Sequence, residues 1–123
     1  MKELNEFFVG QEASFERTIS KEVIESFISL SGDDNPLHLD NNYAFNTELE
    51  GTVAHGMLSM SFVSTLIGKY LPGPGSLWVS QDFQFLLPVR EDDKLTFHAK
   101  IIEIFEREES LKLYVNVKNQ QNR

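Results

Sequence analysis

One segment of this chain, residues 56–68, has no charged side chain and carries apolar residues that point in every direction on a helical wheel. Its apolar members are Met57, Leu58, Met60, Phe62, Val63, Leu66 and Ile67. A helix that is apolar all round belongs in a protein interior or in a membrane, and a membrane span needs roughly 20 such residues. We therefore expect one long buried helix that the rest of the chain surrounds, and no membrane segment.

Three runs of alternating apolar and polar residues follow this helix and predict the structure around it. They cover residues 77–87, 95–101 and 111–118. The apolar positions on one face of the first run are Leu77, Val79, Phe83, Phe85 and Leu87. Successive runs of period two favour antiparallel strands with one solvated face. The pattern predicts an α+β fold, in which an antiparallel sheet wraps around the buried helix.

The first half of the chain predicts smaller elements. Residues 12–18 alternate weakly and indicate a first strand, and a helix is expected between a Ser20 cap and a Gly32 stop. Residues 32–55 have few apolar runs and predict a long irregular stretch, with a short helix around residues 43–46. Long loops inside compact domains are often functional, so this stretch is where we expect the site.

Composition narrows the function classes. The 123 residues suffice for a single domain, here taken as residues 1–123. There is no cysteine, which excludes disulfides and thiolate chemistry, and the formal net charge of -8 argues against nucleic acid as a partner. The first ten residues lack the basic start and apolar run of a signal peptide, so we expect a cytoplasmic protein.

The densest polar cluster is the stretch from Ser31 to Asp40, which contains Asp33 and His38. Asn35-Pro36 would tighten a turn between them and bring a carboxylate and an imidazole toward one water. From residue types alone, a turn-capping Asp33 and a surface His38 are the more favoured interpretation. Together with Asp40 and His55 they also form a set of metal-ligand types, but the spacing matches no ligand motif and we expect no metal.

Gly56 begins the predicted buried helix, where free N–H groups and the helix dipole would polarise a carbonyl. A glycine there permits either close approach of a ligand or tight packing of the helix, and the sequence does not separate the two. Ser64 lies two turns further on, where a bond back to the helix backbone is the simpler role. Met57, Met60 and Ile67 are expected in the core, with a weaker prediction that they line an acyl pocket.

The stretch SGDDNPLHLD (residues 31–40) followed by AHGML (residues 54–58) resembles the hydratase-2 motif of the MaoC-like (R)-specific enoyl-CoA hydratases. The stretches LPGPGS (residues 71–76) and FQFLLPV (residues 83–89) are also similar to that family. The resemblance covers nearly the whole chain in the right order, and the paired motif is long and specific.

This resemblance implies a hot-dog fold, a homodimer or higher homo-oligomer, and reversible hydration of trans-2-enoyl-CoA to (R)-3-hydroxyacyl-CoA in fatty acid metabolism without a cofactor. It makes Asp33 and His38 the catalytic residues and overturns the turn-and-surface interpretation. The Gly56 N–H would bind the thioester oxygen and Ser64 would support the site. Asn35 would orient the catalytic pair, and His55 is grouped with the substrate-binding residues.

Two departures from the family and three alternative functions accompany the resemblance. Residues 90–93 read REDD where relatives usually have a Gly-Asp turn, so this turn is expected to differ. The chain ends at residue 123, where relatives usually continue into one more strand, and an oligomer could cover the strand edge left open. The alternatives are a 3-hydroxyacyl-acyl carrier protein dehydratase, a hot-dog thioesterase and a non-catalytic acyl-CoA-binding module.

Overall fold

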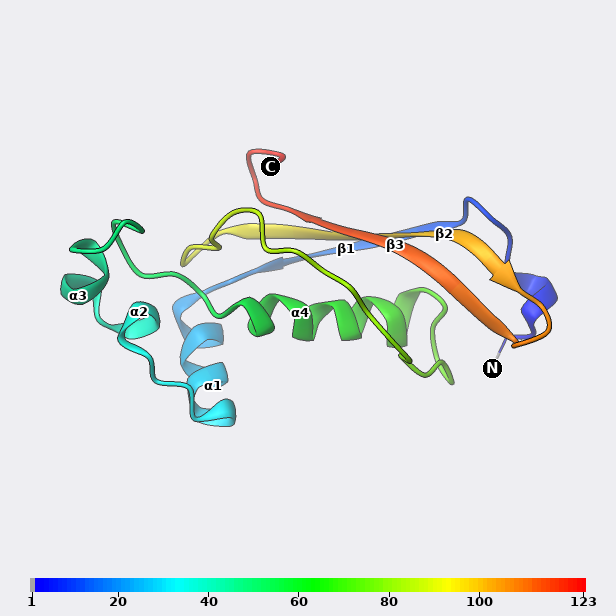
Figure 1. The fold of residues 1–123 in the computed structure, drawn as a ribbon, viewed down its shortest axis with the longest axis horizontal. Coiled ribbons are helices and arrows are strands. Elements are labelled where there is room, and N and C mark those ends of the chain that lie inside the picture. Colours follow the sequence, from blue (N-terminus) through cyan, green and yellow to red (C-terminus); the bar gives the residue numbers. More distant parts are fainter. Residues whose placement is uncertain (1) are drawn as a thin grey trace.

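The computed structural model describes residues 2–123 and has at its centre a three-stranded antiparallel sheet with a helix along one face (Figure 1). The strands are β1 (Glu12–Thr18), β2 (Lys94–Phe105) and β3 (Ser110–Lys118), in the order β1-β2-β3. In the register, Phe97 of β2 lies between Phe15 and Val117. The predicted strands at residues 12–18, 95–101 and 111–118 are therefore confirmed.

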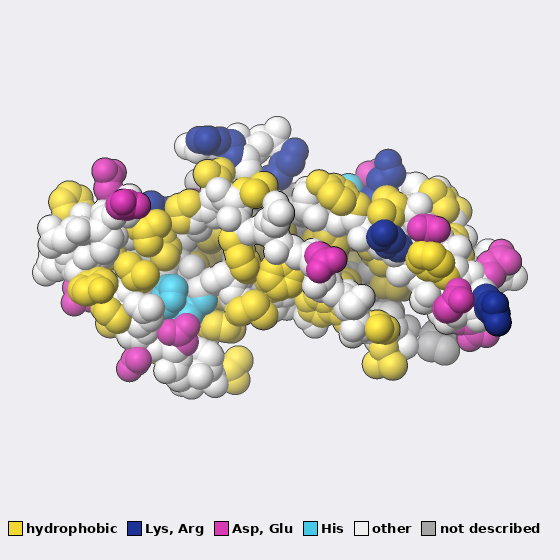
Figure 2. All heavy atoms as spheres, viewed as in Figure 1, with side chains coloured by type: hydrophobic (Ala, Val, Ile, Leu, Met, Phe, Trp, Pro, Cys, Tyr) yellow, Lys and Arg dark blue, Asp and Glu magenta, His cyan; other side chains and the backbone are white. Residues whose placement is uncertain are grey.

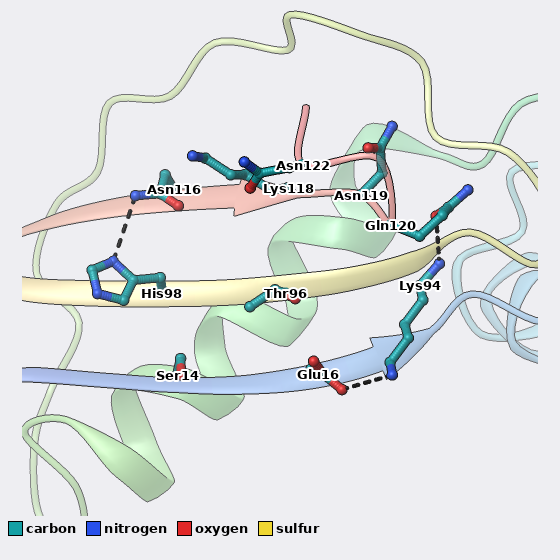
Figure 3. A pocket seen from close by; sticks show the side chains of 10 residues that line it. All are labelled: Ser14, Glu16, Lys94, Thr96, His98, Asn116, Lys118, Asn119, Gln120 and Asn122. Carbon is teal, nitrogen blue, oxygen red and sulfur yellow. Dashed lines mark hydrogen bonds and ion pairs between the residues drawn. The ribbon is translucent and has the colours of Figure 1, made fainter.

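The two faces of the sheet differ as the alternation predicts. Leu95, Phe97, Ala99 and Ile101 of β2 are buried against the helix. The opposite face is polar and open, and Figure 3 looks onto it where the C-terminal residues curl over a shallow hollow. Side-chain contacts join neighbouring strands there, a hydrogen bond between His98 and Glu12 at 3.0 Å and an ion pair between Lys94 and Glu16 at 2.9 Å. This outer face is a solvated sheet surface, away from the core.

The helix on the inner face covers the predicted residues but is less enclosed than predicted. Helix α4 (Gly56–Thr65) continues into a π-helical turn, Leu66–Tyr70. Its buried residues are Leu58, Ser59, Met60 and Val63, followed by Leu66 and Ile67, whereas Met57 is 58% exposed. The prediction of a helix buried on all sides is therefore wrong, because the sheet covers only one of its faces. Within residues 2–123, no helix is long and apolar enough to cross a membrane.

The predicted strand at residues 77–87 is also wrong. This segment, yellow-green in Figure 1, passes along α4 as extended chain without joining the sheet. A strand requires a neighbour for its backbone, and no backbone N–H of residues 77–87 has an acceptor within the described part of the chain. Leu77 and Val79 are each 88% exposed and Leu86 is 82% exposed. Hydrophobic side chains accordingly gather on this face of the molecule (Figure 2).

The three α-helices that precede α4 cluster at one end of the molecule, away from the N-terminus (Figure 1). A short 3₁₀ turn, Leu4–Glu6, comes first in the chain. Helix α1 (Lys21–Ser31) is capped by the Ser20 hydroxyl and ends at Gly32 with φ 77°, both as predicted. Helices α2 (Pro36–Leu39) and α3 (Asn41–Phe45) follow. The short helix expected near residue 43 is confirmed, whereas α2 was not predicted.

Residues 90–93, where the sequence predicts an unusual turn, form a tight turn. Asp92 has φ 68°, a left-handed conformation for which glycine is the usual residue. The Asp93 carboxylate accepts the Arg90 N–H at 2.8 Å, and Ile19 exchanges backbone bonds with Asp92 and Asp93. An aspartate thus occupies the strained position, and the turn joins the start of β2 to the end of β1.

Candidate active site

Three side chains from separate segments converge beside α4. Asp33 lies in the loop after α1, His38 is on α2, and His55 immediately precedes α4. One donor or acceptor atom from each lies within 4.8 Å of the others. Figure 2 shows histidine side chains reaching the surface beside acidic ones at this end of the molecule. The structure therefore brings together the pair that the resemblance makes catalytic, with a second histidine.

A chain of local hydrogen bonds orients Asp33. Its N–H donates to the Ser31 hydroxyl at 3.1 Å, and its Oδ1 accepts the Asn35 N–H at 3.2 Å. The Asn35 side chain in turn accepts the Leu37 N–H at 3.0 Å and caps α2, with Pro36 as the first helical residue. Asn35 therefore acts on the site by starting the helix that carries His38. The second oxygen of Asp33, Oδ2, is directed toward His38.

His38 is held by a backbone carbonyl. Its Nδ1 lies 2.7 Å from the Val53 carbonyl oxygen, and because a carbonyl only accepts, Nδ1 carries the proton in this bond. In the neutral ring, Nε2 then presents a lone pair, and it faces Asp33 Oδ2 at 3.9 Å. A lone pair and a carboxylate are both acceptors, so the neutral pair makes no direct hydrogen bond. A water with two protons is the species that satisfies both groups.

His55 is buried beside this pair and contacts both of its members. Its Nε2 lies 3.0 Å from the Asp33 carbonyl oxygen, and its ring stacks on that of His38 with centroids 3.7 Å apart. The Phe27 ring packs on it at 4.8 Å, and His55 is only 3% exposed. Because Nε2 donates to the carbonyl, Nδ1 is unprotonated in the neutral ring, and it is buried without a partner among the described residues. His55 thus has the environment of a positioning residue.

The same three residues offer metal-ligand atoms, but their orientation does not favour chelation. The two imidazole rings stack 3.7 Å apart with planes that differ by only 25°, so an ion in the plane of one ring, where its lone pair points, would lie out of the plane of the other. Asp40, the fourth residue of the ligand-type set, is used to cap α3 through the Tyr43 N–H at 3.0 Å. The geometry suits a hydrogen-bonded water better than an ion.

Gly56 is the first residue of α4, and its amide has no acceptor among residues 2–123. The helix dipole adds to the polarity of this N–H, which makes it a competent donor to an oxyanion. A Cβ at this position would lie 2.9 Å from the ring of Phe85. Tight packing therefore already accounts for the glycine, while its approach to a ligand remains a prediction.

The other predicted residues are distributed differently. Ser64 and Met57 lie on the exposed side of α4, whereas Met60 and Ile67 are buried in the core. Sequence analysis missed the Val53 carbonyl that holds His38. A backbone acceptor leaves no side-chain signal, and only the fold shows which carbonyl is used.

A model of the MaoC-like domain matches residues 6–122. The chain belongs to the MaoC-like domain family. This MaoC-like chain is 46% identical to an (R)-specific enoyl-CoA hydratase of Rhodospirillum rubrum over 87 residues, which are 71% of this chain and 60% of that protein. It is 40% identical over 93 residues to an (R)-specific enoyl-CoA hydratase of Aeromonas caviae, covering 76% of this chain and 69% of that one. The match thus spans less than two thirds of the Rhodospirillum relative.

The fold of this MaoC-like chain is shared with a solved structure. The unliganded R-hydratase PhaJ1 of Pseudomonas aeruginosa superposes with a TM-score of 0.90 at 34% identity, covering 98% of this chain and 77% of that one. The hot-dog fold that the motif implies, and the α+β class that the alternation predicts, are therefore confirmed. The MaoC-like family assignment is confirmed as well.

Proposed function

We propose that this MaoC-like chain is an (R)-specific enoyl-CoA hydratase that adds water to trans-2-enoyl-CoA and also catalyses the reverse dehydration. The observation that carries the proposal is the 3.9 Å separation of two facing acceptors, Asp33 Oδ2 and the Nε2 lone pair of His38. Such a pair has no stabilising contact of its own in the neutral state, but it is matched to one water. The (R)-specific hydratases of Rhodospirillum rubrum and Aeromonas caviae, at 46% and 40% identity, support the same assignment.

The proposed reaction starts with this water. Its protons are directed at the carboxylate and at Nε2, so its oxygen lone pair is free to point at C3 of the substrate. The thioester oxygen is placed at the Gly56 N–H, which the helix dipole makes a stronger donor. This contact withdraws electrons from C3 and makes the carbon electrophilic.

Bond changes balance without a redox step. As the water oxygen bonds to C3, one O–H bond breaks and its proton passes to the catalytic pair. The π electrons of the C2=C3 bond move toward the thioester oxygen as an enolate, which the Gly56 N–H stabilises. A proton from the pair then returns to C2, so the net change is addition of one water. Asp33 and His38 share these proton-transfer roles between them.

The test is to mix the protein with crotonyl-CoA and follow loss of the enoyl thioester absorbance, with chiral analysis of the product. Formation of (R)-3-hydroxybutyryl-CoA supports the proposal. Release of free thiol would instead indicate a thioesterase, and turnover of the crotonyl-acyl carrier protein alone would indicate the carrier-protein dehydratase. Binding of the thioester without turnover would leave an acyl-CoA-binding module and overturn the enzymatic assignment.

We also propose that the chain functions as a homodimer in which segment 77–87 pairs with a second copy. Its backbone N–H groups lack acceptors in the described chain, and Leu77, Val79 and Leu86 are more than four-fifths exposed. A row of unpaired backbone groups is a template for pairing with another chain. Light scattering after gel filtration should give twice the monomer mass of 14.1 kDa, and a monomer at micromolar concentration would contradict the proposal.

A further inference from the structure

Arg90 makes an unusual set of contacts close to the site. Its guanidinium donates to three carbonyl oxygens of one loop, to Leu49 at 2.6 Å, Gly51 at 3.1 Å and Thr52 at 3.2 Å. No carboxylate forms a salt bridge with this side chain in the described chain. The guanidinium of Arg90 therefore interacts with backbone carbonyl dipoles. The loop that carries these carbonyls has two residues with positive φ, Glu50 at 58° and Gly51 at 154°.

The backbone of Arg90 is anchored to the end of the sheet. Its N–H donates to Asp93 Oδ2 at 2.8 Å, and the other oxygen of this buried carboxylate accepts the Gln120 side chain at 2.9 Å. The neighbouring Val89 carbonyl accepts the Ala54 N–H at 2.7 Å. Arg90 therefore joins the hydrogen-bonded turn at the start of β2 to the loop at residues 49–54.

This loop leads directly to His38. The next residue after the clamped carbonyls, Val53, donates its N–H to the Leu37 carbonyl at 3.0 Å and accepts His38 Nδ1 at 2.7 Å. The path from Arg90 to the imidazole thus consists of two hydrogen-bonded steps through one short loop. Moving Val53 would remove the acceptor that keeps the ring proton on Nδ1.

We propose that Arg90 is a positioning residue that sets the tautomer of His38 by clamping the loop that carries the Val53 carbonyl. The effect of this tautomer on catalysis rests on the proposed hydratase function, in which the Nε2 lone pair of His38 accepts a proton from the water. An arginine suits this task, since its planar, permanently charged fork reaches several carbonyls at once, which a lysine ammonium does not do.

The experiment compares R90Q and R90K with R107Q, which removes the same charge from an exposed turn. Long-range ¹H–¹⁵N NMR of the imidazoles in the free protein reports the His38 tautomer without any substrate. We expect wild type and R107Q to show protonated Nδ1, and both Arg90 variants to show a mixture. With crotonyl-CoA, the Arg90 variants should lose roughly 10- to 100-fold in kcat with KM changed far less, as for a misplaced catalytic group.

An unchanged His38 tautomer in a folded Arg90 variant would overturn the proposal, whatever its activity. If the Arg90 variants change the His38 tautomer but the wild-type protein does not hydrate crotonyl-CoA, the positioning role of Arg90 is supported. Only the proposed hydratase function is then refuted. If R90Q does not fold, as judged by its melting curve, R90K is assessed by the same two criteria, because it keeps the charge and nearly the length of the side chain. A rise in KM with unchanged kcat would also count against positioning.

Discussion

Two irregular stretches of this chain, residues 46–55 and residues 77–87, have opposite relations to the fold. The first is polar, and its backbone is tied to the rest of the molecule through Arg90, His38 and the Val89 carbonyl. The second is apolar and alternating, yet no backbone N–H in it has an acceptor in the described residues. Buried backbone groups must find partners, so an extended chain without them is stable only in water or against another molecule.

This contrast indicates which region is held by contacts within the chain and which is not. The proposed water site draws on one chain, because the hydrogen bonds that orient Asp33 and His38 are made within the described residues. Segment 77–87 has no acceptor for its backbone N–H groups among the described residues, and its large apolar side chains face solvent. The site should therefore respond to changes in single side chains, while the segment should respond to changes in association.

The largest effect is expected from the proposed catalytic pair, Asp33 and His38. Asp33→Asn and His38→Ala should each lower kcat for crotonyl-CoA at least ~10²-fold, since either change leaves the water with one acceptor. Circular dichroism should show the fold intact, because Asp33 is half exposed and the His38 side chain lies at the edge of the core. Full hydration activity in either variant would contradict the assignment of Asp33 and His38. The contrast between a site held within one chain and a segment that depends on association would then no longer stand.

The next effect concerns association. Leu86→Lys should weaken the proposed dimer more than tenfold, because it places a charge where two copies pair. Leu30→Lys is the matched control, since Leu30 on α1 is exposed to nearly the same extent, 83% against 82%. Sedimentation equilibrium measures both variants. Equal dissociation constants for L86K and L30K would show that segment 77–87 is not the interface.

The sequence predicted the parts of the fold that depend on local pattern. The cap at Ser20, the stop at Gly32 and the alternation of β2 each reflect chemistry within a few residues, and all three are as expected. The motif likewise brought Asp33 and His38 together correctly. Segment 77–87 was mispredicted for a physical reason, since its alternation is genuine but a strand also needs a neighbouring backbone, which period alone does not report.

The same reasoning explains the helix and the site. The composition of α4 predicted burial on all sides, whereas the described chain covers only one side and leaves Met57 and Ser64 exposed. The Val53 carbonyl and the Arg90 clamp were beyond sequence analysis, because both depend on where a loop backbone lies. The grouping of His55 with the substrate-binding residues stays a prediction, and the structure adds its burial and its bond to the Asp33 carbonyl.

His55→Phe tests that support with a smaller expected effect. The ring still stacks on His38 and Phe27, but the donor to the Asp33 carbonyl is lost, so kcat should fall about tenfold. The lost hydrogen bond costs about 0.5–1.5 kcal/mol, and removal of the unpaired buried Nδ1 offsets much of this. Chemical denaturation should therefore show little change in stability. A stable variant with wild-type kcat would show that His55 only fills space.

The smallest effect is expected at the turn of residues 90–93, which follows segment 77–87 and contacts the first region through Arg90. Asp92 has φ 68°, and an L residue in this conformation is strained, although aspartate less than most. Asp92→Gly should therefore raise the stability by about 0.5–1 kcal/mol after the entropic cost of glycine, a gain of a few degrees in Tm. The same substitution at Asp82, in the unpaired segment and without positive φ, relieves no strain and should give no gain. Equal increases in Tm for D92G and D82G would mean that strain at the turn contributes nothing, and that the two regions respond alike to loss of a side chain.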